Sequence, residues 1–168
     1  MNKNSARCEV RGAGWWEEMK GSEGTEKEMQ ESRFETFEVT ADVGIMAYGD
    51  TLHELFANVA RGMFALMVEP GMARPAKVVL VEAHGPDLPS LLVAWLNELL
   101  FRCEVEGWAP ADVRVLEVEG GRVQGELLGE PADPTRHRFK GVVKAATYHL
   151  VECQRGGDRW RARVVFDV

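Results

Sequence analysis

The stretch DLPSLLVAWLNELLFRC (residues 87–103) repeats large apolar residues at the three- and four-residue spacing of an amphipathic helix. The stripe consists of Leu88, Leu91, Leu92, Trp95, Leu96, Leu99, Leu100 and Cys103. Asp87 is a suitable N-cap, and Pro89 falls in the first turn, where a missing N–H costs little. We therefore predict a strongly hydrophobic helix that is largely buried.

A second amphipathic helix is predicted upstream, in residues 51–67. Its apolar stripe consists of Leu52, Leu55, Phe56, Val59, Met63, Leu66 and Met67. Thr51 and Glu54 have the spacing of a capping box, in which each side chain bonds the backbone N–H of the other residue. Pro70-Gly71 is expected to end the helix. Burying a large side chain contributes about 1.5–3 kcal/mol, so the two helices can supply much of the core energy if a sheet receives them.

Short runs rich in Val and Leu, with alternating apolar residues, predict that sheet. They are residues 76–83, 113–118, 122–128, 142–152 and 160–167. Gly120-Gly121 and Gly156-Gly157 separate consecutive runs and predict hairpin turns. Strands before, between and after two helices favour a two-layer α+β sandwich over a doubly wound parallel sheet.

The 168 residues are enough for one domain plus a tail, and 45% hydrophobic with 28% charged residues is typical of a globular chain. Residues 1–33 contain six Lys or Arg and seven Glu without a periodic apolar face, so we expect a flexible N-terminal tail. The folded domain is expected to span residues 34–168. A net charge of −7 argues against a basic nucleic-acid-binding domain, so contact with RNA is expected only through a partner.

Several classes of protein are disfavoured by missing patterns. The longest apolar stretch is too short to cross a membrane, and the N-terminus lacks the apolar block of a signal peptide, so we expect a cytoplasmic protein without membrane contact. Cys8, Cys103 and Cys153 form no C-x-x-C pair and are expected to be reduced thiols. The sequence contains neither a Rossmann-type G-x-G-x-x-G loop nor a Walker A loop, so nucleotide binding through either is excluded. It also lacks a G-x-S-x-G elbow, so covalent catalysis has no support.

Carboxylates near the C-terminus suggest a cation site. Asp167 interrupts the apolar alternation of the last strand and is followed directly by the α-carboxylate of Val168. Asp42, in VTADVGI, is the candidate third carboxylate. Oxygen ligands alone suit Mg²⁺, Mn²⁺ or Ca²⁺. The alternative is that Asp42 makes an Asx turn while Asp167 caps a frayed strand end.

Four segments together resemble the archease family, which assists the GTP-dependent tRNA-splicing RNA ligase. They are TADVGIMAYGDTLHELFANVARGMFALM (40–67), DLPSLLVAWLNELLF (87–101), VKAATYH (143–149) and VVFDV (164–168). The resemblance implies a mixed, mostly antiparallel β-sheet with the two helices on one face. It also implies that Asp42, Asp167 and the Val168 carboxylate hold a divalent cation.

The same resemblance assigns further residues in the VKAATYH strand. Lys144 matches a family lysine, and it, Tyr148 and His149 are candidates for contacting a partner or supporting the cation ligands. Tyr148 could instead pack under the helices. Strand alternation would place Lys144 and Tyr148 on one face and His149 on the other.

The resemblance predicts a protein cofactor, not an enzyme, that promotes guanylylation and multiple turnover of the ligase. The alternatives are a metal-dependent hydrolase and a general chaperone or modulator of RNA-modifying enzymes. The chain departs from the family pattern at Val39, where a His is usual, and at Lys140 and Val142, where Gly and an acidic residue are common. The first departure predicts weaker cation binding, and the second predicts a more basic and apolar partner surface.

Overall fold

The computed structural model describes residues 33–141 and 143–168, which form one compact unit. The elements follow the order β1 (Phe34–Val39), β2 (Asp42–Gly49), α2 (Leu52–Met67), β3 (Lys77–His84), α3 (Leu88–Glu104), β4 (Trp108–Glu119), β5 (Arg122–Pro131), β6 (Ala145–Gly156) and β7 (Arg159–Asp167). The predicted tail 1–33 lies, except for Arg33, outside the described residues and stays a prediction, as does the interpretation of Cys8. None of the helices in the described ranges is long and apolar enough to cross a membrane.

Helix α2 begins where its cap was predicted, although the cap differs in detail. Thr51 Oγ1 accepts a hydrogen bond from Glu54 N at 3.2 Å, as expected. The carboxylate of Glu54, however, accepts from the backbone N–H of Asp50 at 2.8 Å, one residue before the predicted donor. The predicted bond to the Thr51 side chain is therefore confirmed. The predicted bond from Thr51 N–H to Glu54 is wrong, because the Glu54 carboxylate bonds the N–H of the preceding residue, Asp50.

Helix α3 also begins at its predicted cap. Asp87 Oδ1 accepts from Ser90 N at 2.8 Å, and Pro89 lies in the first turn. The predicted apolar stripe is buried from Leu91 to Cys103, and Trp95 has no exposed surface. The prediction that this helix is largely buried is therefore confirmed.

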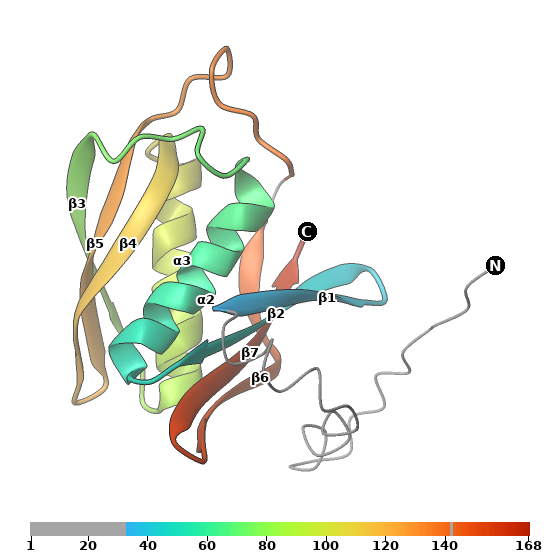
Figure 1. Cartoon of the computed structure of the whole chain (residues 1–168), viewed down its shortest axis with the longest axis vertical. Helices are drawn as coiled ribbons and strands as arrows, with labels where there is room; N and C mark the ends of the chain where they lie inside the picture. Colours follow the sequence, from blue (N-terminus) through green and yellow to red (C-terminus); the bar gives the residue numbers. More distant parts are fainter. Residues whose placement is uncertain (1–32, 142) are drawn as a thin grey trace. The chain divides into compact units, whose positions relative to one another are not determined.

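The strands form two antiparallel sheets with the helices between them (Figure 1). One sheet has the order β1-β2-β7-β6 and the other has the order β3-β5-β4. Helix α2 packs on β2 and β4, and α3 packs on β6 and β3, so each helix contacts both sheets. The α+β class, the two helices and the antiparallel pairing are confirmed. The predicted two layers are three, because the strands divide into two sheets and the helices lie between them rather than on one face of a single sheet. This division follows from helices that are apolar on more than one side.

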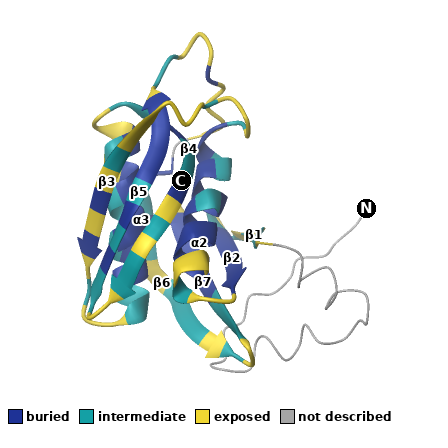
Figure 2. Ribbon diagram, turned by 60° about the vertical axis from the view of Figure 1, so that its left-hand side comes forward, coloured by how far each residue is buried: buried dark blue, intermediate teal, exposed yellow. Residues whose placement is uncertain are grey.

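The core lies between the two sheets, where Figure 2 shows the helices as mostly buried. Large side chains without exposed surface come from all three layers, among them Phe56, Trp95, Leu127 and Phe166. Gly125 of β5 lies so close to α3 that an added Cβ would fall 2.8 Å from the Trp95 ring. A side chain at this position would therefore push the helix and the sheet apart.

Candidate functional site

A tight turn between β1 and β2 positions the predicted cation ligand Asp42. Val39 pairs with Asp42, which leaves the two-residue loop Thr40-Ala41. Thr40 has a φ of 44°, a value that hairpin turns require at their first loop position and that glycine normally provides. A threonine in this region costs roughly 1–3 kcal/mol, and such strain often occurs at functional sites.

The pairing of β2 with β7 brings Asp42 and Asp167 to the same end of the sheet. Val43 lies opposite Phe166, so the next position on each strand is Asp42 and Asp167. Asp42 is partly buried, whereas Asp167 and Val168 are exposed. The structure therefore brings together the three residues predicted to hold a cation, although Asp42 is more than 120 positions from Asp167 and Val168 in sequence.

Lys144 lies at the same end of the sheet, on the other side of β7. Its backbone N–H donates to Asp167 O at 2.8 Å, and its Nζ donates to Val168 O at 3.0 Å. The ammonium group of Lys144 is thus held at the last residue of the chain. Four of the six predicted site residues lie together here, at an exposed rim.

Tyr148 and His149 lie further along β6, in an unusually large bulge. The β6–β7 register holds through Thr147 and resumes at Glu152, so residues 148–151 lie opposite Val164 alone. The bulge interrupts strand alternation, and both Tyr148 and His149 are exposed. The exposed fraction of Tyr148 is 65%, so the alternative that it packs under the helices is wrong.

A buried arginine that the sequence analysis did not single out supports this bulge. Arg163 of β7 is only 4% exposed, and its Nε donates to Leu150 O at 3.0 Å. Leu150 has a φ of 55°, an unfavourable conformation for a non-glycine residue. Nothing in the sequence distinguishes Arg163, because β7 also contains Arg159 and Arg161.

Asn97 of α3 is the second supporting residue that was missed. Its Nδ2 donates to Ala146 O at 3.0 Å, and its Oδ1 accepts from Ala146 N at 2.8 Å. These are the two hydrogen bonds that a neighbouring strand would make, and β6 is an edge strand. Asn97 therefore closes the edge of β6 between Lys144 and the bulge.

Comparison with known proteins identifies the family. A model of the Archease protein family (MTH1598/TM1083) matches residues 34–168. The chain belongs to the archease family. The resemblance noted in the sequence is thereby confirmed.

Curated archeases and solved structures agree with this assignment. Protein archease of Methanopyrus kandleri is 39% identical over 138 residues, covering 80% of this chain and 99% of the relative, and that of Pyrococcus furiosus is 39% identical over 81% and 99%. The solution structure of Methanobacterium thermoautotrophicum protein 1598 matches with a TM-score of 0.69 at 36% identity, over 81% of this chain and 99% of that one. A Thermotoga maritima archease, described as a possible chaperone, matches with a TM-score of 0.52 at 22% identity over 80% and 96%, which supports the fold.

The aspartate pair of this archease is not part of a larger cluster of metal-binding side chains. Among residues 33–141 and 143–168, no three His, Cys, Asp or Glu side chains are grouped to hold a metal ion. The predicted site has two such side chains, and its third ligand is the Val168 carboxylate. Cation binding by Asp42, Asp167 and Val168 thus stays a prediction, and it requires the Val168 carboxylate as the third ligand.

A second cluster has the composition of a catalytic site but the hydrogen bonds of a structural one. His137 is buried; its Nδ1 accepts from Asp133 N at 2.9 Å, and its Nε2 lies 3.0 Å from Glu130 Oε1. Arg136 also contacts Glu130, at 2.8 Å. Hydrogen bonds from Arg136, His137 and the Arg74 backbone lower the pKa of Glu130 from 4.5 to about 2. Both imidazole nitrogens of His137 are therefore engaged in hydrogen bonds, so His137 is not available as a general base. These hydrogen bonds instead stabilise the loop after β5.

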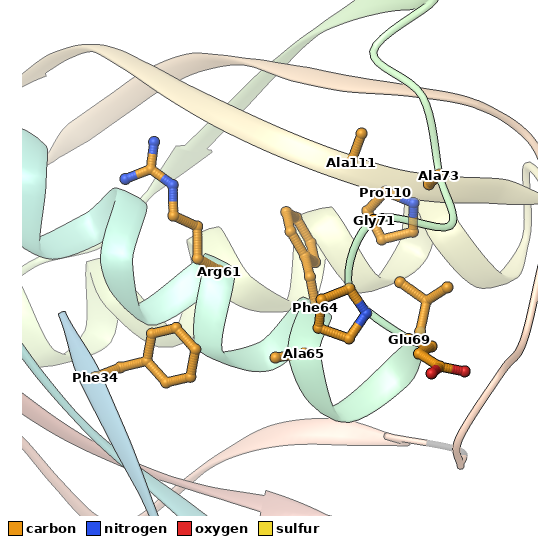
Figure 3. A pocket seen from close by; sticks show the side chains of 11 residues that line it. Phe34, Arg61, Phe64, Ala65, Glu69, Gly71, Ala73, Pro110 and Ala111 are labelled. Atoms are coloured by element: carbon orange, nitrogen blue, oxygen red, sulfur yellow. The ribbon is translucent and has the colours of Figure 1, made fainter. Parts of the chain in front are cut away.

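A cavity of about 210 Å³ lies between the C-terminal half of α2, the loop that follows it and the start of β4 (Figure 3). Phe34, Phe64 and Pro110 form much of its wall, and Arg61 supplies a positive charge. The Arg61 guanidinium already donates to Asp112 Oδ1 at 2.7 Å and to neighbouring groups. None of the predicted site residues lines this cavity, so it has no part in the site.

Proposed function

We propose that this protein is a non-catalytic, metal-binding activator of the GTP-dependent tRNA-splicing RNA ligase. It would act in the cytoplasm, promoting transfer of GMP to the ligase and multiple rounds of RNA joining. Membership of the archease family supports the proposal. The observation that carries it is the meeting of Asp42, Asp167 and the end of the chain at one exposed rim, beside Lys144.

The donor set fits a hard divalent cation. Asp42, Asp167 and the Val168 carboxylate would supply oxygen ligands only, which suit Ca²⁺, Mn²⁺ or Mg²⁺. Lys144 offsets only part of the negative charge of these three carboxylates, and a bound cation would neutralise the remainder. A cation at an exposed rim would also offer open positions to an anionic group of the partner.

The location of the rim favours an activator over a hydrolase. Asp167, Val168 and Lys144 are exposed at a sheet end, whereas small-molecule active sites are usually concave and largely enclosed. A general chaperone of RNA-modifying enzymes would use the same rim with other partners. The ligase experiment below separates the activator from the hydrolase, and pull-down of the native partner separates the ligase activator from a general chaperone.

The decisive experiment follows ligase guanylylation and RNA product while the protein is present below the ligase concentration, with GTP, Mn²⁺ and broken RNA. The wild-type chain should accelerate guanylylation and permit multiple turnovers, and alone it should show no nuclease, GTPase or ligase activity. Asp42→Asn and Asp167→Asn should each abolish the acceleration. Asp158→Asn is the matched control, because Asp158 is an exposed aspartate at the opposite end of β7.

Two results would count against the proposal. Unchanged ligase turnover would exclude the activator function, and metal-dependent phosphoester hydrolysis by the protein alone would favour the hydrolase. Circular dichroism of each variant shows whether a loss of activity reflects a loss of fold.

Cation binding can be measured without the ligase. A ligand that binds only the folded state stabilises it by RT ln(1 + [L]/Kd), so Ca²⁺ or Mn²⁺ should raise the melting temperature. The Asp42→Asn/Asp167→Asn double variant should lose this rise. Residues appended after Val168 should weaken it, because its carboxylate becomes an amide. A double variant that responds like wild type would remove the basis for the site.

A further inference from the structure

The acidic charge of the chain is interrupted by a basic span without acidic residues. Residues 134–151 contain Arg136, Arg138, Lys140 and Lys144 but neither Asp nor Glu. The remaining 150 residues hold 16 Lys and Arg against 27 Asp and Glu, a net charge of −11. The net negative charge of the whole chain therefore conceals a local concentration of positive charge in this span.

Three of the four basic side chains in this span are exposed outside the Glu130 cluster. Arg138 is 80% exposed along its side chain and lies 3.7 Å from Glu69. Lys140 and Lys144 are exposed, and backbone hydrogen bonds to Met67 O and Asp167 O hold them in place. Figure 2 shows the loop after β5 as exposed over much of its length.

Exposed aromatic side chains accompany these charges. Phe139 is 47% exposed, and the His137 ring supports it edge-on at 6.1 Å. The β6 bulge holds Tyr148 outward at 65% exposure, with His149 beside it. We call the residues Arg138, Phe139, Lys140, Lys144, Tyr148 and His149 the basic ledge.

The basic ledge follows the chain over a short distance. Lys140, Lys144 and Tyr148 are each four residues apart, and four extended residues span at most about 14 Å. Exposed cationic and aromatic side chains thus follow one another within a short stretch of the chain. This combination is typical of proteins that bind single-stranded nucleic acid, where cations contact phosphates and rings stack on bases.

We propose that the basic ledge binds single-stranded RNA directly. A single strand is favoured over a duplex because stacked pairs hide the base faces that Phe139 and Tyr148 would contact. An acidic protein surface would satisfy the charges but would leave both exposed rings unexplained. The proposal goes beyond ligase activation and revises the expectation, drawn from net charge, that RNA contact runs only through a partner.

The test measures fluorescence anisotropy of a labelled oligouridine of about 12 nucleotides with the full chain alone. Two phosphate contacts, by Arg138 and Lys140, predict a salt slope near −1.4, so affinity should fall about sevenfold between 50 and 200 mM salt. Arg138→Glu and Lys140→Glu should each lower the slope by about 0.7. Lys77→Glu makes the same charge change on exposed β3 and should leave the slope unchanged.

Aromatic stacking has its own matched pair of variants. Tyr148→Ala should weaken binding roughly fivefold or more, whereas Phe101→Ala, at an exposed aromatic on α3, should not. Tighter binding of a duplex, equal effects of Lys77→Glu and Lys140→Glu, or binding of polyglutamate in place of RNA would each overturn the proposal.

Arg138→Glu keeps the test valid if Lys140→Glu disturbs the end of α2, where Lys140 Nζ donates to Ala65 O. Because no ligase is present, failure here leaves the ligase experiment intact, and failure of ligase activation leaves this measurement interpretable.

Discussion

Replacing Asn97 with alanine should destabilise the fold through the edge of β6. Asn97 makes two hydrogen bonds to Ala146, a residue that is only 4% exposed. The substitution leaves the N–H and C=O of Ala146 without these partners, and an unsatisfied buried polar group costs about 1–3 kcal/mol. Alanine regains about 0.5 kcal/mol as the better helix former. With two such groups, the free energy of unfolding should therefore fall by roughly 1.5–5.5 kcal/mol.

The two hydrogen bonds can be separated by a second substitution. Asn97→Asp keeps an acceptor for Ala146 N but has no donor for Ala146 O. This variant should therefore retain the hydrogen bond from Ala146 N and lose only the hydrogen bond to Ala146 O. Glu104→Ala is the control on the same helix, because Glu104 is exposed; its effect should stay within about 0.5 kcal/mol.

Urea denaturation at equilibrium measures the loss of stability, and hydrogen exchange of the Ala146 amide reports on the edge itself. In Asn97→Ala this amide should exchange faster than the rest of the sheet. A loss below about 0.5 kcal/mol with an unchanged m-value would refute the reasoning, because it would mean that the two hydrogen bonds contribute nothing net.

Three further outcomes are expected. Because the pKa of Glu130 is lowered from 4.5 to about 2, chiefly by Arg136, its contribution to stability is present above pH 4.5 and is lost as the pH falls toward 2; Glu130→Gln should flatten acid unfolding curves in that range. Gly125→Ala should destabilise by about 1–3 kcal/mol or more in denaturant titrations, since the new Cβ would meet Trp95 and the Arg114 carbonyl oxygen. Burial raises the pKa of Cys103 to about 12, so iodoacetamide should modify it rapidly only after denaturation.

The helices could be predicted because their signals are local. Thr51 and Asp87 cap the helices within three residues, and the apolar stripes repeat along each segment. Strands before the first helix were expected, but no residue range was assigned to them, because no local signal marks their turn. Their turn uses Thr40 where glycine would have signalled a hairpin, and residues 34–49 show no clean alternation.

Features that depend on distant pairing could not be predicted from periodicity. Alternation along β7 groups Arg163 with Arg161 and Asp167, opposite the apolar Ala162 and Val164, yet Arg163 is buried and supports the bulge. The bulge contains no glycine, and residues 142–152 read as one continuous strand. The meeting of Asp42 with Asp167 was anticipated through resemblance to archeases, since residue types alone also allowed two unrelated turn and cap roles.

The pairing of β2 with β7 has a consequence for how the protein is made. Val43 and Phe166 are neighbours in space but belong to the first and last thirds of the chain, a contact of high sequence separation that forms slowly in folding. During synthesis β2 leaves the ribosome long before β7, and until then its inner edge lacks a partner strand. The rim that carries Asp42 is therefore assembled at the end of translation, so a chain truncated before β7 would present an open strand edge and lack the complete rim.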